Sequence, residues 1–194
     1  YKLRQMLNVA HIYEAKTYNL TSKQELNRFN IFNLTPVYEV KPCSNLAHQF
    51  LRLSTINELV KVQSYNANHK VQLQPIFELQ KIYSDQVYFN LTIVAPETIS
   101  ADSINNVNFN FNTFGLKAIL RQLCYIFNCE LQLSKATNEY LYPTDTLSIH
   151  YNGKLIGYIG AIKSNYLKPY KLNNEMIYVL TINIDDLIKD YKQS

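Results

Sequence analysis

The segment that decides the fold runs from Gln49 to Tyr83 and reads QFLRLSTINELVKVQSYNANHKVQLQPIFELQKIY. In its first half, five residues recur at helical spacing and share one face of a helix. They are Ile56, Leu59, Val60, Gln63 and Ala67. From Ile76 to Tyr83 the pattern changes to a period of two, which is typical of a strand. The segment therefore predicts a helix that leads into a strand.

The start of this helix has a signal of its own. Ser54 and Thr55 precede the periodic run, and Glu58 follows Thr55 by three positions. At that spacing a hydroxyl and a carboxylate each accept a hydrogen bond from a free backbone amide at the helix N-terminus. We expect Thr55 and Glu58 to cap the helix in this way.

Two hairpins are expected to build the sheet. The turn at 84–86 joins the strand described above to a second β-rich run at 87–95, so these two strands should pair antiparallel. Asn152-Gly153 separates runs at 147–151 and 154–162, and both residues tolerate the positive φ that a tight hairpin needs.

Further helices are predicted by apolar spacing and capping signals. They run from 1 to 10 with Leu3, Met6, Leu7 and Ala10 on one face, from a Thr113 cap to Phe127, and onward from Asp185-Asp186. Weaker patterns predict strands at 12–18, 30–34, 131–134 and 177–184, a helical turn at 21–26, a loop with Pro36 and Pro42, and a long surface connection at 96–112. The whole indicates an α+β fold, an antiparallel sheet flanked by helices that cover one face.

Length and composition set broad limits. The chain has 194 residues, the usual size of one domain, and begins without methionine, so we expect a single domain excised from a longer chain. Hydrophobic residues make up 47% and charged residues 18%, which is typical of a globular protein. The net charge of +4 permits RNA contact without requiring it. Three cysteines that cannot all pair, and no apolar run of membrane-spanning length, favour a reduced cytosolic compartment.

The sequence has no recognisable catalytic, cofactor or metal motif. The four histidines stand apart without metal-ligand spacing, and the four glycines cannot form a phosphate-binding loop. Gly157 and Gly160 within one strand instead indicate close packing or a bulge. Tyr151 and Tyr158 flank a hairpin where bases could stack, although 16 tyrosines in a β-rich chain are better explained as core and interface residues.

Six phrases in order resemble the catalytic-like module of the bacterial phenylalanyl-tRNA synthetase β subunit. They are Leu3-Arg4-Gln5-Met6-Leu7 leading to Tyr13-Glu14 and Thr17-Tyr18; Leu51-Arg52-Leu53-Ser54; Tyr65-Asn66-Ala67-Asn68; Ile76-Phe77-Glu78-Leu79; Gly115-Leu116-Lys117; and the run from Gly153 to Gly160. The resemblance implies a class II aminoacyl-tRNA synthetase-like core whose active site has been lost. It also implies that the first helix and strand help to pack α and β subunits into an (αβ)2 assembly, with ATP and Mg²⁺ used by the parent complex.

The arginines agree with an inert module. Adenylation needs oriented cations to stabilise phosphate charge, and the chain has only Arg4, Arg28, Arg52 and Arg121. No arginine follows position 121, and the link from Asn68 to Phe77 is too short for a long nucleotide-binding loop between paired strands. We therefore interpret Arg52 as structural, at the start of the central helix.

The sequence thus predicts a non-catalytic module that supports a catalytic α subunit, with a second αβ pair as a further partner. The predicted interface is the exposed flank of the first helix, Tyr1, Arg4, Gln5 and Asn8, because its apolar stripe should face the sheet. The predicted structural motif comprises Arg52, Ser54, Asn66, Asn68, Phe77 and Glu78. Two alternatives remain open: a module that binds tRNA, and a self-sufficient ATP-dependent ligase.

Overall fold

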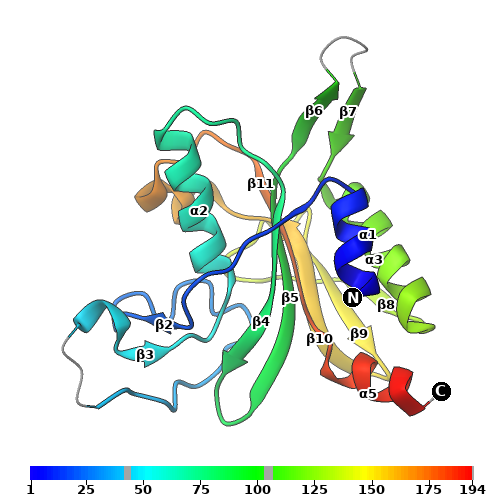
Figure 1. The fold of residues 1–194 in the computed structure, drawn as a ribbon, viewed down its shortest axis with the longest axis horizontal. Coiled ribbons are helices and arrows are strands. Elements are labelled where there is room, and N and C mark those ends of the chain that lie inside the picture. Colours follow the sequence, from blue (N-terminus) through cyan, green and yellow to red (C-terminus); the bar gives the residue numbers. More distant parts are fainter. Residues whose placement is uncertain (42–44, 103–106, 194) are drawn as a thin grey trace.

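A seven-stranded sheet forms the centre of the molecule in the computed structural model, which describes residues 1–41, 45–102 and 107–193. Every neighbouring pair of strands is antiparallel except the pair of β1 and β4, which is parallel (Figure 1). In spatial order the strands are β1 (Tyr13–Glu14), β4 (Ile76–Tyr83), β5 (Val87–Pro96), β11 (Ile177–Asn183), β10 (Lys154–Ala161), β9 (Leu147–Tyr151) and β8 (Gln132–Lys135). The predicted α+β class with a mostly antiparallel sheet is confirmed.

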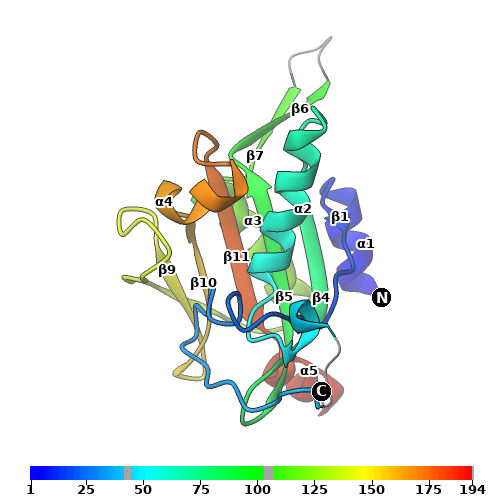
Figure 2. The same ribbon diagram turned by 90° about the vertical axis from the view of Figure 1, so that its left-hand side faces the viewer.

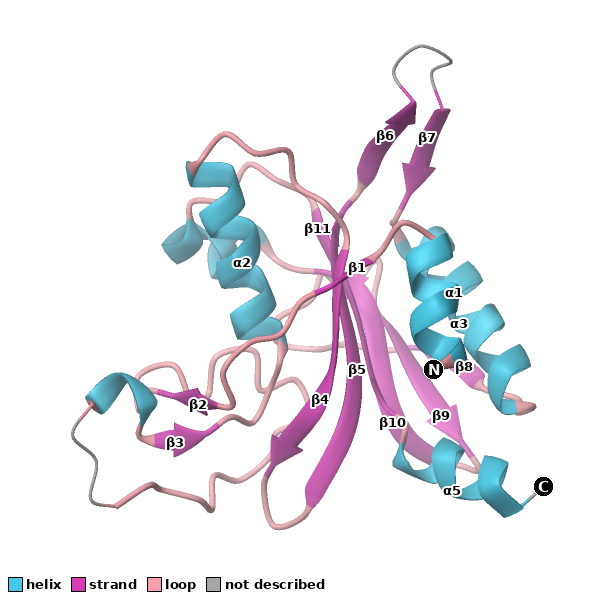
Figure 3. Cartoon of the chain, in the orientation of Figure 1, coloured by secondary structure: helices cyan, strands magenta, loops and turns pink. Residues whose placement is uncertain are grey.

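Helices cover both faces of this sheet, whereas the sequence predicted one covered face (Figure 3). Helices α1 (Lys2–Val9), α3 (Thr113–Phe127) and α5 (Asp185–Gln193) pack on one face. Helix α2 (Ile56–Asn68) packs on the other, together with α4 (Ser164–Leu167) and the short helix η2 (Lys168–Tyr170) (Figure 2). The central strands explain this, because residues 90–96 and 177–182 are buried at every position. Strands buried on both sides need two covering layers.

The two predicted hairpins are confirmed. Strands β4 and β5 pair along their length, from Ile76 opposite Val94 to Tyr83 opposite Val87. Asn152 and Gly153 have φ of 49° and 77°, the positive values that their tight turn between β9 and β10 requires. The register shifts between Leu155 and Gly157, which is the bulge that the glycine pair indicated.

The region from 96 to 112 is not the loop that the sequence predicted. Strand β5 continues to Pro96, and β6 (Thr98–Asp102) then pairs antiparallel with β7 (Val107–Asn110) in a hairpin that projects beyond the sheet (Figure 1). The prediction was wrong because Asn and Ser dominate the segment. Those residues favour loops, but here Ile99 and Phe111 are buried and anchor the hairpin at its base.

Several weaker predictions were also wrong. The strand at 12–18 is reduced to β1, and 30–34 forms a turn, because Phe29 and Asn33 adopt positive φ. By contrast, the helical turn expected at 21–26 is present as successive turns over 22–28, in which the Ser22 carbonyl accepts from the Glu25 amide at 3.1 Å. These turns follow β2 (Leu20–Thr21) and precede η1 (Leu46–His48) and β3 (Phe50–Leu51). Helix α3 is capped by Asn112, whose side chain accepts from two backbone amides at 3.1 Å, and not by Thr113. Pro42 and Cys43 lie outside the described residues.

The two cysteines of the described chain are free thiols at the end of α3. Burial raises the pKa of Cys124, and burial followed by the proximity of Cys124 raises the pKa of Cys129 to about 12. At pH 8 both thiols are therefore protonated and poor nucleophiles.

We expect iodoacetamide to alkylate Cys129 of a native Cys43→Ser variant at pH 8 at least about a hundredfold more slowly than Cys129 of the same chain in denaturant. The rate for Cys129 should rise about tenfold per pH unit from 8 to 10, because reactivity follows the thiolate fraction. Mass spectrometry of labelled peptides gives both rates. If native and denatured chains react equally fast, the half-buried placement of Cys124 and Cys129 is contradicted.

Candidate functional site

A buried ion pair lies where two of the six family-like sequence phrases, the one with Arg52 and the one with Glu78, meet in the fold. Arg52 follows β3 and Glu78 lies in the middle of β4, and their side chains are 2% and 1% exposed. The two guanidinium NH groups donate to the two carboxylate oxygens at 3.2 and 3.3 Å. This bidentate geometry is the strongest form of an arginine–carboxylate contact. It joins the entry of α2 to the sheet.

Thr17, in the segment after β1, completes the pair. Its backbone amide donates to Glu78 at 2.9 Å, and its hydroxyl donates to the other oxygen of Glu78 at 2.8 Å. Arg52 also donates to the Thr17 hydroxyl at 2.6 Å and to the Tyr18 carbonyl at 3.3 Å. Among the described residues, the Nε atom of Arg52 has no partner. The carboxylate therefore has four donors, and three segments distant in sequence meet at this cluster.

Other residues of the predicted structural motif have separate roles. Phe77 is fully buried on the opposite face of β4 from Glu78. Ser54 accepts from the Ile56 amide at 3.2 Å, close to Arg52 in the chain. Asn66 and Asn68 lie at the far end of α2, where the Asn66 carbonyl accepts from two amides that close the helix. The structure thus brings Arg52 and Glu78 together, and leaves the two asparagines apart.

The side chains of Thr55 and Glu58 do not cap α2 as predicted. Thr55 is the N-cap residue but caps no amide, because its hydroxyl donates to the Thr92 hydroxyl at 2.5 Å. Glu58 instead accepts from Lys61 at 2.9 Å on the helix surface. A contact with the sheet has replaced the local capping interaction. Ser54 is the residue that supplies a side-chain acceptor at this helix start.

The predicted interface residues lie on the outer flank of α1. Leu3 and Leu7 of the apolar stripe are buried against the sheet, and Met6 and Ala10 pack beside them, so the stripe faces inward as expected. The interface residues themselves, Tyr1, Arg4, Gln5 and Asn8, are all exposed. Arg4 pairs with Glu14 of β1 at 2.9 Å, which ties the helix to the edge strand.

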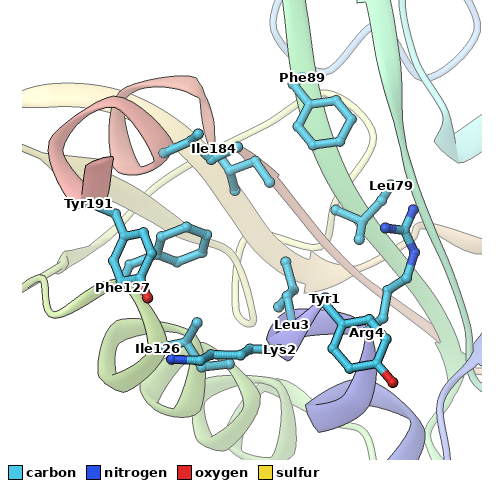
Figure 4. Close-up of a pocket in the computed structure, with 11 residues that line it drawn as sticks. Tyr1, Lys2, Leu3, Arg4, Leu79, Phe89, Ile126, Phe127, Ile184 and Tyr191 are labelled. Carbon is cyan, nitrogen blue, oxygen red and sulfur yellow. The ribbon is translucent and has the colours of Figure 1, made fainter. Parts of the chain in front are cut away.

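A pocket of about 350 Å³ opens beside this flank (Figure 4). Tyr1 and Arg4 lie at its rim, Leu79 and Phe89 come from the sheet, and the ends of α3 and α5 close the other side (Figure 4). The lining is mostly apolar, and the described residues around it include no histidine, cysteine or acid. The pocket can hold an apolar group but offers no catalytic chemistry.

The arginines of the chain do not converge. They are Arg4 on α1, Arg28 in the turns after β2, Arg52 beside β4 and Arg121 on α3. Only Arg52 is buried, beside β4, and its charge is already matched by Glu78. Within the described ranges no group of three or more histidine, cysteine or acidic side chains could hold a metal ion, and no helix is long and apolar enough to cross a membrane.

The sequence did not predict the role of Thr17 in this cluster, and it assigned one connection to the wrong pair of elements. Thr17 lies 61 positions from Glu78, and its only signal was the Thr17-Tyr18 phrase. The link from Asn68 to Phe77 was treated as a connection between paired strands, but it joins α2 to β4. The paired strands β4 and β5 are joined at 84–86, and this turn is too short to reach over a nucleotide.

The fold belongs to the class II aminoacyl-tRNA synthetases. Two solved structures of pyrrolysyl-tRNA synthetase from Desulfitobacterium hafniense superpose on 100% of this chain, with TM-scores of 0.70 and 0.71. The chain covers 67% and 68% of those structures at 12% sequence identity, so the likeness shows the fold alone. The superposed part of this chain includes its whole seven-stranded sheet, with β1 parallel to its neighbour β4.

The particular family is given by sequence. The family model described as the phenylalanyl tRNA synthetase beta chain CLM domain matches residues 1–184, and the chain belongs to this family. The phenylalanine–tRNA ligase beta subunit of Ureaplasma parvum is 33% identical to this chain over 89% of its length. The beta subunit of Mycoplasma genitalium is 30% identical to it over 96%. The chain spans about a quarter of those relatives, 23% and 24% of their length.

Proposed function

We propose that this chain is a single non-catalytic module of a phenylalanyl-tRNA synthetase β subunit, which holds the α subunit that attaches phenylalanine to tRNA with ATP. The proposal rests on the burial and the hydrogen bonds of Arg52. An arginine that binds triphosphate must reach it, whereas Arg52 is 2% exposed and both of its terminal NH groups donate within the cluster, to Glu78, Thr17 and Tyr18. The cluster is best interpreted as the structural support of a class II frame.

The turn between β4 and β5 supports the same conclusion. Residues 84–86 close the hairpin tightly, with the Ser84 amide donating to the Gln86 carbonyl at 2.9 Å. A turn of this length is too short to place side chains over the sheet where they could bind a nucleotide. We therefore expect no phenylalanine-dependent ATP–pyrophosphate exchange by the chain. Exchange above background would favour the self-sufficient ligase instead.

The partner surface follows from the exposed flank of α1. Tyr1 and Val9 are 90% and 81% exposed at the two ends of the helix, and large apolar side chains of this kind are typical of interface cores. The ion pair of Arg4 and Glu14 links α1 to β1, so the two elements present adjoining surface. We assign this surface to the α subunit in a cytoplasmic (αβ)2 assembly.

Co-purification with the cognate α subunit tests the assignment. We expect Gln5→Arg to weaken the complex at least about tenfold, because a charge buried without a partner at an interface costs about 2 kcal/mol or more. Gln122→Arg is the matched control, since Gln122 is exposed on α3. Both variants should melt at the temperature of the unmodified chain.

The comparison has a clear negative outcome. If Gln5→Arg binds the α subunit as well as Gln122→Arg does, the outer flank of α1 is not the interface. If the unmodified chain does not co-elute with the α subunit while the full β subunit does, the assembly role belongs to another part of the β subunit.

A further inference from the structure

A second cavity, of about 280 Å³, lies on the face of the sheet that carries α2. Three segments distant in sequence surround it: the turn at 24–29, the loop at 139–140 and the segment 165–170. It is separate from the flank of α1 and from the buried Arg52 cluster, and neither the family resemblance nor the proposed assembly role uses it. Its walls combine aromatic rings, amides and one arginine.

The aromatic wall is a platform of tilted rings. The ring centroids of Tyr140 and Tyr166 are 4.9 Å apart at an interplanar angle of 60°, and the Phe29 ring lies 5.7 and 6.3 Å from them. Phe29 is buried, whereas both tyrosines line the cavity and are half-buried. Because the rings touch one another, no gap remains between them for a small cation. They present ring surface on which a planar group can stack.

The charges around this platform favour an anionic ligand. Arg28 lines the cavity with its side chain 43% exposed, and its guanidinium lies 5.9 Å from the Tyr170 ring. Lys168 and Lys171 are exposed nearby. Glu25 pairs with Lys61 at 2.5 Å and lies 3.9 Å from Arg28, and Glu139 lines the cavity and accepts from the Tyr166 hydroxyl at 2.9 Å. With Glu25 paired to Lys61, the cations Arg28, Lys168 and Lys171 outnumber Glu139, so the balance of charge around the cavity is positive.

Side-chain amides supply the remaining polar groups. Gln24, Asn27 and Asn165 line the cavity. Each amide offers donors and an acceptor in one plane, the pattern that pairs with the edge of a nucleobase. An aromatic platform with amides and an arginine is the combination that proteins use to hold unpaired bases.

We propose that this cavity binds a nucleobase that carries a phosphate, with the base stacked on the Tyr166 ring, its edge toward Tyr140, and the phosphate beside Arg28. A volume of about 280 Å³ suits one base rather than a duplex. The ligand chemistry is shared by single-stranded RNA and by free mononucleotides. The site goes beyond the assembly role, and either can fail without the other.

Fluorescence anisotropy with a labelled 12-nucleotide single-stranded RNA tests the site. We expect Tyr166→Ala to weaken binding about tenfold, because stacking on one aromatic side chain is worth about 1–3 kcal/mol per base. Tyr166→Phe keeps the ring and should bind within about twofold of the unmodified chain. Tyr125→Ala is the matched control, since Tyr125 is 86% exposed on α3, which packs on the other face of the sheet.

Arg28→Gln gives a second measurement, which tests the phosphate contact and leaves the Tyr166 ring in place. It should lower the slope of log affinity against log salt by about one, as expected for one lost phosphate contact. AMP, GMP, CMP and UMP serve as competitors. Displacement by a mononucleotide identifies a free nucleotide as sufficient, whereas resistance to all four identifies RNA.

Two results would overturn the proposal. One is an unmodified chain that binds neither the RNA nor a mononucleotide. The other is a Tyr166→Ala variant, or an Arg28→Gln variant, that binds with the same affinity and salt slope as Tyr125→Ala. Loss of α-subunit binding has no bearing on either result, because the test needs only this chain.

Discussion

Replacing Glu78 with leucine is expected to lower the free energy of unfolding by about 3–5 kcal/mol, because Arg52 is left as an uncompensated buried charge. Both side chains are at most 2% exposed, so solvent cannot reach the guanidinium without local unfolding. For a chain of this length the melting temperature should fall by about 10 °C. Urea denaturation followed by circular dichroism measures the change.

The double variant Arg52→Met/Glu78→Leu separates charge from packing. Removing both partners leaves no buried charge, and well-packed apolar replacements of a buried ion pair are often neutral or stabilising. We expect it to recover most of the stability lost by Glu78→Leu. The exposed pair of Arg4 and Glu14 provides the matched comparison, and Arg4→Met should cost at most about 1 kcal/mol. If Glu78→Leu costs no more than Arg4→Met, the cluster is not the support proposed above.

The same cluster shows how far the sequence leads. Helix α2 and strand β4 were predicted correctly, because spacing within one segment determines which face is buried. The ion pair joins positions 26 apart, and its third member Thr17 lies 61 positions from Glu78. Periodicity carries no information about such contacts. Only the resemblance to a known family indicated that the sequence phrases containing Thr17, Arg52 and Glu78 belong to one fold.

Local signals failed where a tertiary contact competed with them. Thr55 and Glu58 have the spacing of a capping pair, yet the hydroxyl of Thr55 bonds to Thr92 on the neighbouring sheet. Asn152-Gly153 succeeded because its turn is exposed and no other element competes for it. The aromatic cavity was missed for a further reason. Its walls come from three segments, and the tyrosines that were considered, Tyr151 and Tyr158, lie elsewhere.

Gly157 is the more restricted of the two glycines in strand β10. A Cβ atom there would lie 2.4 Å from the Thr181 carbonyl oxygen and 3.0 Å from the Cα atom of Ile182, both on the backbone of β11. Backbone in the middle of a paired strand cannot move without breaking its hydrogen bonds. We expect Gly157→Ala to cost about 3 kcal/mol, at the upper end for overpacking in a core. Chemical denaturation measures this loss.

Gly160→Ala is the matched control, because it lies in the same strand and is equally buried. A Cβ atom at Gly160 would approach two side-chain atoms, on Leu141 at 3.0 Å and on Thr146 at 3.1 Å. Side chains can shift by a few tenths of an ångström, so this variant should cost only about 1 kcal/mol. Equal losses for the two variants would show that β10 and β11 separate easily at Gly157. A larger loss at Gly157 would mean that its close approach to β11 fixes the register of the sheet at the bulge, with two strands, β5 and β11, between β10 and the β4 strand of the Arg52 cluster.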